Sequence, residues 1–236
     1  MPISKCQEKR LMSDEQFIHP YGPLVYKTKI SDEFHQYLID GLDKSRDASD
    51  AGDTLIGNID VQRRGEAYPP KEFHKFLDPI FLRYLQGRAY SHNERVKFVS
   101  PGEYYDEPPD VSKMEVEYNL GPGPWVNFQK PGEFNPMHNH SGIVSGIIFI
   151  DIPDEISTER KEFHSGAAGC LEFIHGDQHF LIRPKSQYLY MFPAHLWHMV
   201  YPFSTEGIER ISMSFNVMYA KVNGSDLPQS DHFVNY

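Results

Sequence analysis

Cysteine is scarce in this sequence, which has only Cys6 and Cys170 among its 236 residues. Because Cys6 lies in the N-terminal tail, the two are not expected to form a disulfide framework. No run of about 18 apolar residues is present that would span a membrane. The N-terminal stretch MPISKCQEKRLMSDEQ also lacks the apolar core of a signal peptide. These absences predict a protein of the reducing cytoplasm.

Positive charge is also in short supply. The chain has 23 Lys and Arg against 33 Asp and Glu, which gives a net charge of −10. A nucleic-acid polymer or an anionic membrane is therefore not an expected partner, and a small molecule or a peptide is the expected substrate. No internal repeat or low-complexity tract is found, and 39% hydrophobic residues suit a buried core.

Two helical regions are expected in the first part of the chain. Ser31 is a suitable N-cap for SDEFHQYLIDGLDKSRD, whose apolar residues recur at helical spacing. A second apolar stripe runs through PPKEFHKFLDPIFLRYLQG. There, Pro69 and Pro70 are expected to begin the helix and Gly87 to end it, while Pro79 kinks it or divides it in two.

From about residue 95 the helical pattern gives way to short β-type runs, most of them separated by Pro, Gly, Asn or Asp. The runs are VKFVS, KMEVEYNL, WVNFQ, VSGIIFIDI, CLEFI, HFLIR, YLYMF, WHMVYPF and RISMSFNVMYA. Such runs predict a mainly β sandwich or jelly roll with the N-terminal helices packed on one sheet. The proline-rich stretch PGEYYDEPPDV is either a loop over a site or a plain connection.

A single domain is expected over residues 1–236. It would consist of an N-terminal segment (1–30), a helical buttress (31–90), a β core (95–220) and a C-terminal tail (221–236). The sequence says nothing of the oligomeric state.

Histidine is concentrated in one region, where seven of the 12 histidines lie between residues 138 and 198. In GEFNPMHNHSG, His138 and His140 are two residues apart, so in a strand both side chains face the same side. Two neutral imidazoles suit Fe, Zn, Ni or Cu better than Mg or Ca. Taken alone, the pair also fits an ordinary polar strand face.

His198 is the candidate for a third ligand, because a jelly roll brings its apolar segment WHMVYPF beside the earlier histidine pair. His195 competes with it, but a strand does not readily present residues three apart to one ion, so His198 is preferred. Three further histidines of this region are expected at the surface, namely His164, His175 and His179.

The segment ERISMSFN alternates polar with apolar residues. Its polar face either meets water at the surface or turns inward. In the second case the guanidinium of Arg210 and the hydroxyl of Ser212 share a face and would receive a carboxylate.

These segments in this order, WVNFQKPGEFNPMHNHSGIVSGIIFI, FPAHLWHMVYPF and ERISMSFN, resemble the iron(II)- and 2-oxoglutarate-dependent oxygenases. The sequence is most similar to a group of small oxygenases of phages and marine bacteria, over roughly residues 55–220. The resemblance implies a double-stranded β-helix, cupin-like, that holds one Fe(II) at its open end. It also implies the use of 2-oxoglutarate and O₂ to hydroxylate a C–H bond, with release of succinate and CO₂.

Carried over position by position, the resemblance makes His138 and His198 iron ligands and puts His140 where the usual aspartate stands. The distal carboxylate of 2-oxoglutarate would bind Arg210, and Ser212 would donate a hydroxyl. Asn127 and Tyr190 are further expected contacts of the co-substrate.

His140 departs from the family pattern, because a third histidine leaves the site one charge unit more positive than a carboxylate would. Either His140 is a ligand, which its spacing from His138 favours, or another group completes the metal sphere. The nearest carboxylates in the sequence lack the expected spacing; they are Glu133, Asp151 and Glu172.

Two other classes of protein fit parts of the sequence. GEFNPMHNH matches the G-x₅-H-x-H opening of the cupins, so a three-histidine cupin dioxygenase that does not use 2-oxoglutarate is an alternative. The glutamate that cupins carry after the second histidine is missing, and Arg210 and Ser212 have no set role there. A non-catalytic β-sandwich binding module would bind no iron and would leave the histidines as ordinary polar groups.

Overall fold

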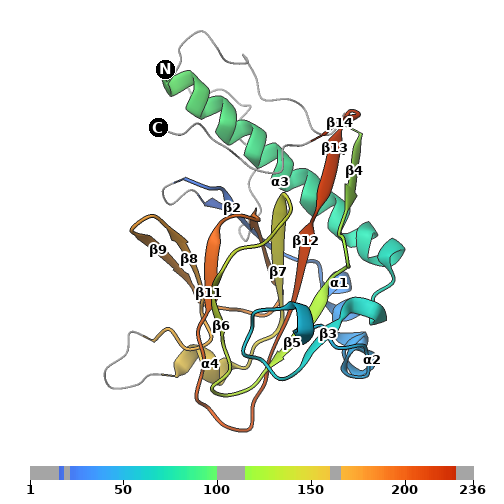
Figure 1. The fold of residues 1–236 in the computed structure, drawn as a ribbon, viewed down its shortest axis with the longest axis vertical. Helices are drawn as coiled ribbons and strands as arrows, with labels where there is room; N and C mark the ends of the chain where they lie inside the picture. Colours follow the sequence, from blue (N-terminus) through green and yellow to red (C-terminus); the bar gives the residue numbers. More distant parts are fainter. Residues whose placement is uncertain (1–15, 19–21, 100–114, 160–165, 227–236) are drawn as a thin grey trace.

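The computed structural model describes residues 16–18, 22–99, 115–159 and 166–226 of the chain. Two antiparallel sheets face each other, and helices cover the outer side of the larger one (Figure 1). The large sheet has the order β1 (Gln16–Ile18), β2 (Val25–Lys29), β10 (Tyr188–Pro193), β7 (Val144–Asp151), β12 (Arg210–Val217), β5 (Trp125–Gln129) and β3 (Gln62–Arg64). The small sheet has the order β6 (Asn135–His138), β11 (Trp197–Val200), β8 (Leu171–His175) and β9 (Gln178–Ile182).

The predicted mainly β fold, a double-stranded β-helix with helices packed on one sheet, is confirmed. A third, small sheet joins β14 (Ser225–Asp226), β13 (Tyr219–Val222) and β4 (Val116–Asn119). The helical elements are α1 (Asp32–Asp40), α2 (Leu42–Arg46), η2 (Gly52–Thr54), η3 (Gly65–Ala67), α3 (Pro70–Val99) and α4 (Asp154–Thr158). None of the helices in the described part of the chain is both long and apolar enough to cross a bilayer.

The first predicted helix begins as expected. The Ser31 hydroxyl accepts a hydrogen bond from the Phe34 N–H at 3.1 Å and so caps α1. Gly41 ends α1, and α2 follows immediately.

The second predicted helix is longer than its sequence signals indicate. α3 runs through Pro79 without division and continues past Gly87, so the prediction that Gly87 ends it is wrong. Phe73, Leu77 and Phe81 are fully buried, and their packing outweighs the local cost of the proline. The strand expected at VKFVS is also wrong, because residues 96–99 are the last turn of α3 and β propensity yields to its context.

Two separate cores lie on the two faces of the large sheet. Alternate residues of β7 supply both: Ile148 belongs to the core under the helices, and Phe149 belongs to the core between the sheets. Phe215 from β12 meets Phe73 of α3 edge-on at 6.0 Å, which fastens α3 to the sheet. The interior between the sheets is the place where the candidate site is built.

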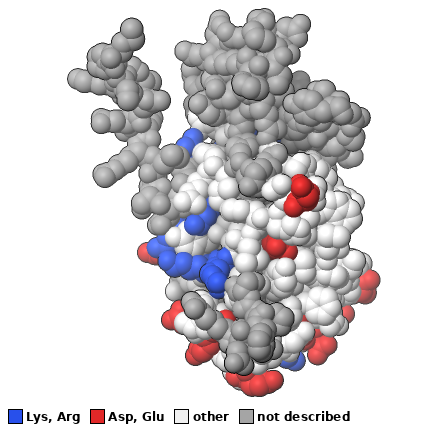
Figure 2. Space-filling model, turned by 90° about the vertical axis from the view of Figure 1, so that its left-hand side faces the viewer, with Lys and Arg blue, Asp and Glu red and all other residues white. Residues whose placement is uncertain are grey.

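Charge is not spread evenly over the surface. Figure 2 shows Lys and Arg side chains gathered on one face, with acidic side chains mostly around its lower edge. Lys27 and Lys185 lie over the ring of Tyr188, at 4.7 and 5.5 Å from its centroid. The net charge of −10 therefore describes the chain as a whole and not each of its faces.

Some predictions fall outside the described residues, namely those on the stretch PGEYYDEPPDV, on Cys6 and on His164. Cys170 is a buried free thiol. The division of the chain into one domain with its four parts stays a prediction.

Candidate metal centre

Three histidines meet at the interior between the two sheets. His138 on β6 pairs directly with His198 on β11, and their ring centroids are 4.3 Å apart. The ring of His140 lies 4.9 Å from that of His138 and 5.0 Å from that of His198. The ligand nitrogens of all three lie within 4.8 Å of one another. A metal held at about 2.1 Å needs nitrogens roughly 3.0–3.4 Å apart, which small side-chain rotations supply.

His140 reaches this cluster in a different way from the one its spacing predicts. The strand β6 ends at His138, so strand alternation does not orient His140. Instead, the N–H of His140 donates to the carbonyl oxygen of Ala194 at 2.9 Å, next to the turn that leads into β11. This backbone bond holds His140 beside the other two rings.

Backbone carbonyls orient two of the three rings. The Nδ1 of His138 donates to the carbonyl of Pro136 at 2.7 Å, and the Nδ1 of His198 donates to that of Leu196 at 2.9 Å. A carbonyl can only accept, so in the neutral ring Nδ1 carries the proton and Nε2 keeps its lone pair. This is the arrangement in which a metal-binding histidine is held by a neighbouring acceptor.

The three rings are uncharged at neutral pH. Burial lowers the pKa of His198 well below its usual value of 6.5, and the neighbouring His138 and His140 lower it further. Burial, helped by His138, lowers the pKa of His140 to about 4. Burial also lowers the pKa of His138, partly offset by its bond to Pro136. A metal therefore meets three imidazoles that need not lose a proton to bind it.

No carboxylate joins this cluster within the described ranges. Glu133 accepts the N–H groups of Asp60 and Lys130 at 3.0 and 2.7 Å, which ties two loop segments together. Glu172 accepts the hydroxyl of Tyr201 at 2.8 Å and lies on the outer side of β8. Asp151 is exposed. The carboxylates considered as substitutes for His140 are thus engaged elsewhere or point to solvent.

The other described histidines of the region do not join the cluster. His195 is exposed and is not a member of it, as the choice of His198 predicts. His175 and His179 are exposed, and His179 forms an ion-pair contact with Glu172 at 3.3 Å.

Arg210 is a buried cation inside the same interior, with only 1% of its surface exposed. Its Nε donates to the carbonyl of Gly169, and its Nη1 donates to Gln129 Oε1 and Ser212 Oγ, each at 3.2 Å. Its Nη2 is buried without a hydrogen-bond partner in the described part of the chain. Burial lowers the pKa of the guanidinium to about 10, which still leaves it charged at pH 7.

A buried guanidinium with a free donor and, among the described residues, no carboxylate bonded to it is suited to receive an anion. The inward orientation considered for the polar face of ERISMSFN is therefore confirmed for Arg210 and Ser212, both 1% exposed.

Asn127 and Tyr190 lie on the inner face of the large sheet as well. The amide of Asn127 donates to Ser214 Oγ at 3.5 Å and accepts from Gln62 Nε2 at 2.8 Å. Tyr190 is buried against Phe149, with ring centroids 5.7 Å apart, and burial raises the pKa of its hydroxyl.

A cavity of about 190 Å³ opens in front of the three histidines. Its wall does not include the four residues predicted to contact 2-oxoglutarate, which are Arg210, Ser212, Asn127 and Tyr190. These are nevertheless its neighbours: Ser214 and Phe192, two positions along β12 and β10, line the cavity, and Asn127 contacts the lining residue Gln62.

Part of the wall comes from residues that sequence reasoning missed. Residues 54–57 line one side of the cavity together with Gln62 from β3. Because β3 is a three-residue strand without a motif, no pattern in the sequence pointed to Gln62. Residues 54–57 are named the strap below.

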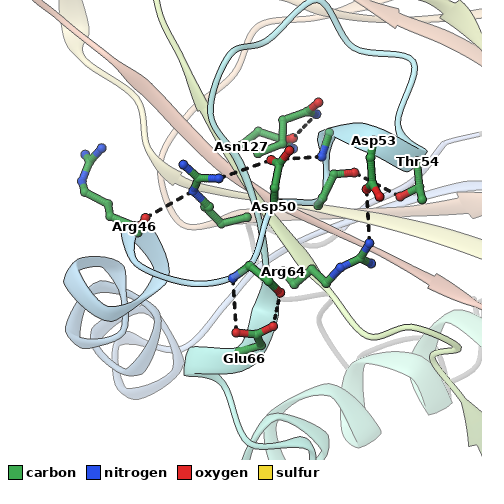
Figure 3. Close-up of polar contacts among 12 residues, drawn as sticks. Arg46, Asp50, Asp53, Thr54, Arg64, Glu66 and Asn127 are labelled. Atoms are coloured by element: carbon green, nitrogen blue, oxygen red, sulfur yellow. Dashed lines mark hydrogen bonds and ion pairs between the residues drawn. The ribbon is translucent and has the colours of Figure 1, made fainter.

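Polar contacts hold the strap in place. Arg64 Nη2 donates to Asp53 Oδ1 at 3.3 Å (Figure 3). The Thr54 hydroxyl donates to the carbonyl oxygen of Ala51 at 3.0 Å. At the far end of the strap, Asn58 exchanges backbone hydrogen bonds with Phe134, at 2.9 and 3.3 Å. The strap is thus fastened to the segment that leads into β6 and His138.

One family model matches part of the chain. Residues 123–216 match the family model described as "Putative 2OG-Fe(II) oxygenase", which confirms the resemblance drawn from the sequence. No curated protein matches the chain.

Solved structures similar to this chain include a Pseudomonas putida prolyl-4-hydroxylase (14% identity, TM-score 0.41, covering 82% of this chain and 92% of that one). Another is a Trichoplax adhaerens prolyl hydroxylase in complex with a hypoxia inducible factor peptide fragment (11%, 0.46, 82% and 83%). A third is a Burkholderia pseudomallei oxidoreductase of the 2OG-Fe(II) oxygenase family (12%, 0.43, 80% and 82%). Likenesses of this degree say nothing of the substrate.

Proposed function

Because the segment that matches the 2OG-Fe(II) oxygenase family contains all three clustered histidines and Arg210, we propose that this protein is an Fe(II)- and 2-oxoglutarate-dependent oxygenase. The proposed reaction hydroxylates a C–H bond. One oxygen atom of O₂ enters the substrate and the other enters succinate, while 2-oxoglutarate loses CO₂.

The proposed iron ligands are the Nε2 atoms of His138 and His198 and one ring nitrogen of His140. Three ligands on one side of the metal leave three positions open, two for the keto acid and one for O₂. The bound iron, together with 2-oxoglutarate and O₂, supplies the oxidising chemistry. The chain itself needs to bind, orient and shield the reactants.

The observation that carries the proposal is the unpartnered Nη2 of Arg210. A buried donor of this kind is costly unless a ligand bonds to it, and a carboxylate is its best partner. We assign the distal carboxylate of 2-oxoglutarate to Arg210, with the Ser212 hydroxyl beside it. Asn127 and Tyr190 remain proposed contacts of the co-substrate.

The neutral histidines and the apolar residues around them suit a reaction that must exclude water. Phe192 packs edge-on against His198 at 4.9 Å, and Leu171 and Val200 line the cavity beside it. Within the described residues, the cavity wall holds no titratable side chain other than the three histidines. Hydroxylation at a metal requires no separate acid or base from this wall.

The competing classes explain less of this arrangement. A cupin dioxygenase that does not use 2-oxoglutarate has no use for a buried guanidinium with a free donor. A β-sandwich binding module gives no reason for two histidines whose Nδ1 protons are fixed while Nε2 stays open. The substrate is proposed to be a small molecule or a peptide, and the location to be the cytoplasm.

The test is iron binding and succinate release from 2-oxoglutarate by the wild type, His198→Ala and Arg210→Ala. His198→Ala should lose both iron and turnover, whereas Arg210→Ala should keep iron and lose turnover. Arg183→Ala, which removes an exposed arginine of the chain, is the control and should behave as wild type. A wild type that binds neither iron nor 2-oxoglutarate would overturn the proposal.

A further inference from the structure

The cavity in front of the three histidines has an uncharged but hydrogen-bonding wall. Among the described residues that line it there is no Asp, Glu, Lys or Arg. Its polar groups are carboxamides and hydroxyls, supplied by Gln62, Asn135, Asn139, Asn216, Thr54, Ser145 and Ser214. Away from the metal, a charged group placed against these side chains would lose its hydration without gaining a counter-charge from them. The wall therefore selects a neutral polar group.

Gln62 has a side-chain acceptor that no described group donates to. Its side chain is buried, with 1% exposure, and its Nε2 donates to Asn127 Oδ1 at 2.8 Å. Asn127 is in turn bonded to Ser214, which holds the amide plane of Gln62 from one end. The other end, Oε1, is buried and has no partner among the described residues. Gln62 is one of the residues that line the cavity, and a buried acceptor of this kind is satisfied when a bound group donates to it.

The position of Gln62 in the sequence separates it from the metal and co-substrate groups. The three histidines, Arg210 and Ser212 all lie inside the family segment at residues 123–216, whereas Gln62 and the strap precede it. The N-terminal part of the chain therefore adds this one side of the wall to the oxygenase segment. Such an addition suits recognition of a particular substrate better than a step common to the family.

We propose that the cavity binds an uncharged substrate group bearing an amide N–H, and that Gln62 Oε1 accepts the hydrogen bond from that N–H. The inference rests on the proposed function, because it takes the group facing the histidines to be the one that is oxidised. Gln62 would then determine specificity by accepting amides with a free N–H and rejecting those without one. The amide could belong to a small molecule or to a peptide chain.

The test uses matched pairs of amides with the protein loaded anaerobically with Fe(II) and 2-oxoglutarate. One pair is 2-pyrrolidinone and N-methyl-2-pyrrolidinone, and the other is acetyl-trialanine amide and its form N-methylated at the central residue. Uncapped trialanine, which is charged at both ends, is the third probe. Binding is followed by the fluorescence of Trp125, which lines the cavity, in a Trp197→Phe background that removes the other of the two tryptophans.

At least one N–H amide should bind to the wild type about tenfold more tightly than its N-methylated partner. This is the effect expected when the N-methylated compound cannot form a buried hydrogen bond. The pair that shows this preference tells whether the substrate's amide belongs to a small molecule or to a peptide. Uncapped trialanine should bind more weakly than the capped peptide. When O₂ is admitted, the preferred amide should raise succinate release above the rate without it.

Two variants of Gln62 test the role of the acceptor. Gln62→Leu should bring the two members of each pair to within about twofold of each other, while iron binding stays unchanged. Gln62→Glu keeps an acceptor oxygen on the side chain and should keep the preference for N–H. Gln178→Leu, a glutamine substitution on another strand away from this cavity, is the control and should bind as wild type.

Three results would overturn the inference while the proposed function stands. They are normal succinate release without binding of either N–H amide, a preference that survives Gln62→Leu, and a preference for N–H that is lost equally in the control Gln178→Leu. Absence of iron and 2-oxoglutarate binding in the wild type would instead defeat the proposed function and the inference together.

Discussion

Replacing Arg210 with methionine is expected to remove the thermal stabilisation that 2-oxoglutarate gives to the iron-loaded protein. A ligand present at about 100 times its Kd stabilises the folded state by about 2.7 kcal/mol. With an unfolding entropy of about 2.1 cal/mol/K per residue, the 236 residues convert this energy into a rise in Tm of about 5 °C. The wild type should show a shift of this size.

The methionine variant loses a charge-assisted pair of hydrogen bonds to the carboxylate, worth about 3 kcal/mol or roughly a hundredfold in Kd. The same concentration of 2-oxoglutarate is then about equal to the Kd of the variant. The stabilisation therefore falls to about 0.4 kcal/mol and the rise in Tm to less than about 1 °C. Differential scanning fluorimetry under anaerobic conditions measures both shifts. The exposed Arg183, changed to methionine, is the control and should keep the full shift.

The Tm without 2-oxoglutarate must be measured separately, because two effects oppose each other there. Burial lowers the pKa of Arg210 from its ordinary value to about 10. At pH 7, below both values, the folded state bears a cost of about 3 kcal/mol for the charge, which methionine removes. Methionine also leaves Gly169, Gln129 and Ser212 without their donor. Only the change caused by 2-oxoglutarate is diagnostic, and a full shift in Arg210→Met would refute the assignment.

His140→Asp should keep iron through purification, since a carboxylate suits the metal equally well, whereas loss of iron in a folded variant would contradict His140 as a ligand. In the metal-free protein, the lowered pKa of His140 means that between pH 6.5 and about 4 the unfolded chain binds a proton that the folded chain does not. The free energy of unfolding by urea should therefore fall as the pH is lowered from 7 to 5, and less steeply in His140→Gln. Gly57→Ala should place a methyl group against the side chain of Asn135 and loosen the strap, seen as faster hydrogen exchange at the amide of Asn58. Gly52→Ala meets only ordinary contacts and should leave that exchange unchanged.

Much of the β core was predictable because its signals are local. The runs from WVNFQ to RISMSFNVMYA are short, apolar and separated by turn residues, and strands form at those positions. The extent of α3 was not predictable, since Pro79 and Gly87 are local stop signals. Their effect is overridden by contacts with β12 and β1 that are distant in the sequence: Phe73 packs on Phe215, and the ring of Phe17 lies against Gly87.

The candidate site, like the fold, has residues that the sequence predicts and residues that it does not. His138 could be chosen from the sequence by its spacing from His140, His198 because it lies in an apolar segment, and Arg210 from the alternation of ERISMSFN. No pattern in the sequence singles out Gln62. Its hydrogen bond to Asn127 and the cavity that it lines exist only in the folded chain. His140 was chosen by strand alternation, but a backbone bond to Ala194 beyond the end of β6 is what positions it.

The charges of the interior form one consistent pattern. Three neutral imidazoles leave a bound Fe(II) with both of its positive charges, and Arg210 adds a third positive charge on the same inner side of the large sheet. The buried carboxylates nearby, Glu133 and Glu172, already accept bonds from other groups, and among the described residues none joins the histidines or lines the cavity. In a low-dielectric interior such positive charge requires an anion. A dicarboxylate with a keto acid at one end and a second carboxylate at the other supplies negative charge at both places. His140 in place of a carboxylate thus makes the site depend more strongly on 2-oxoglutarate for its charge balance.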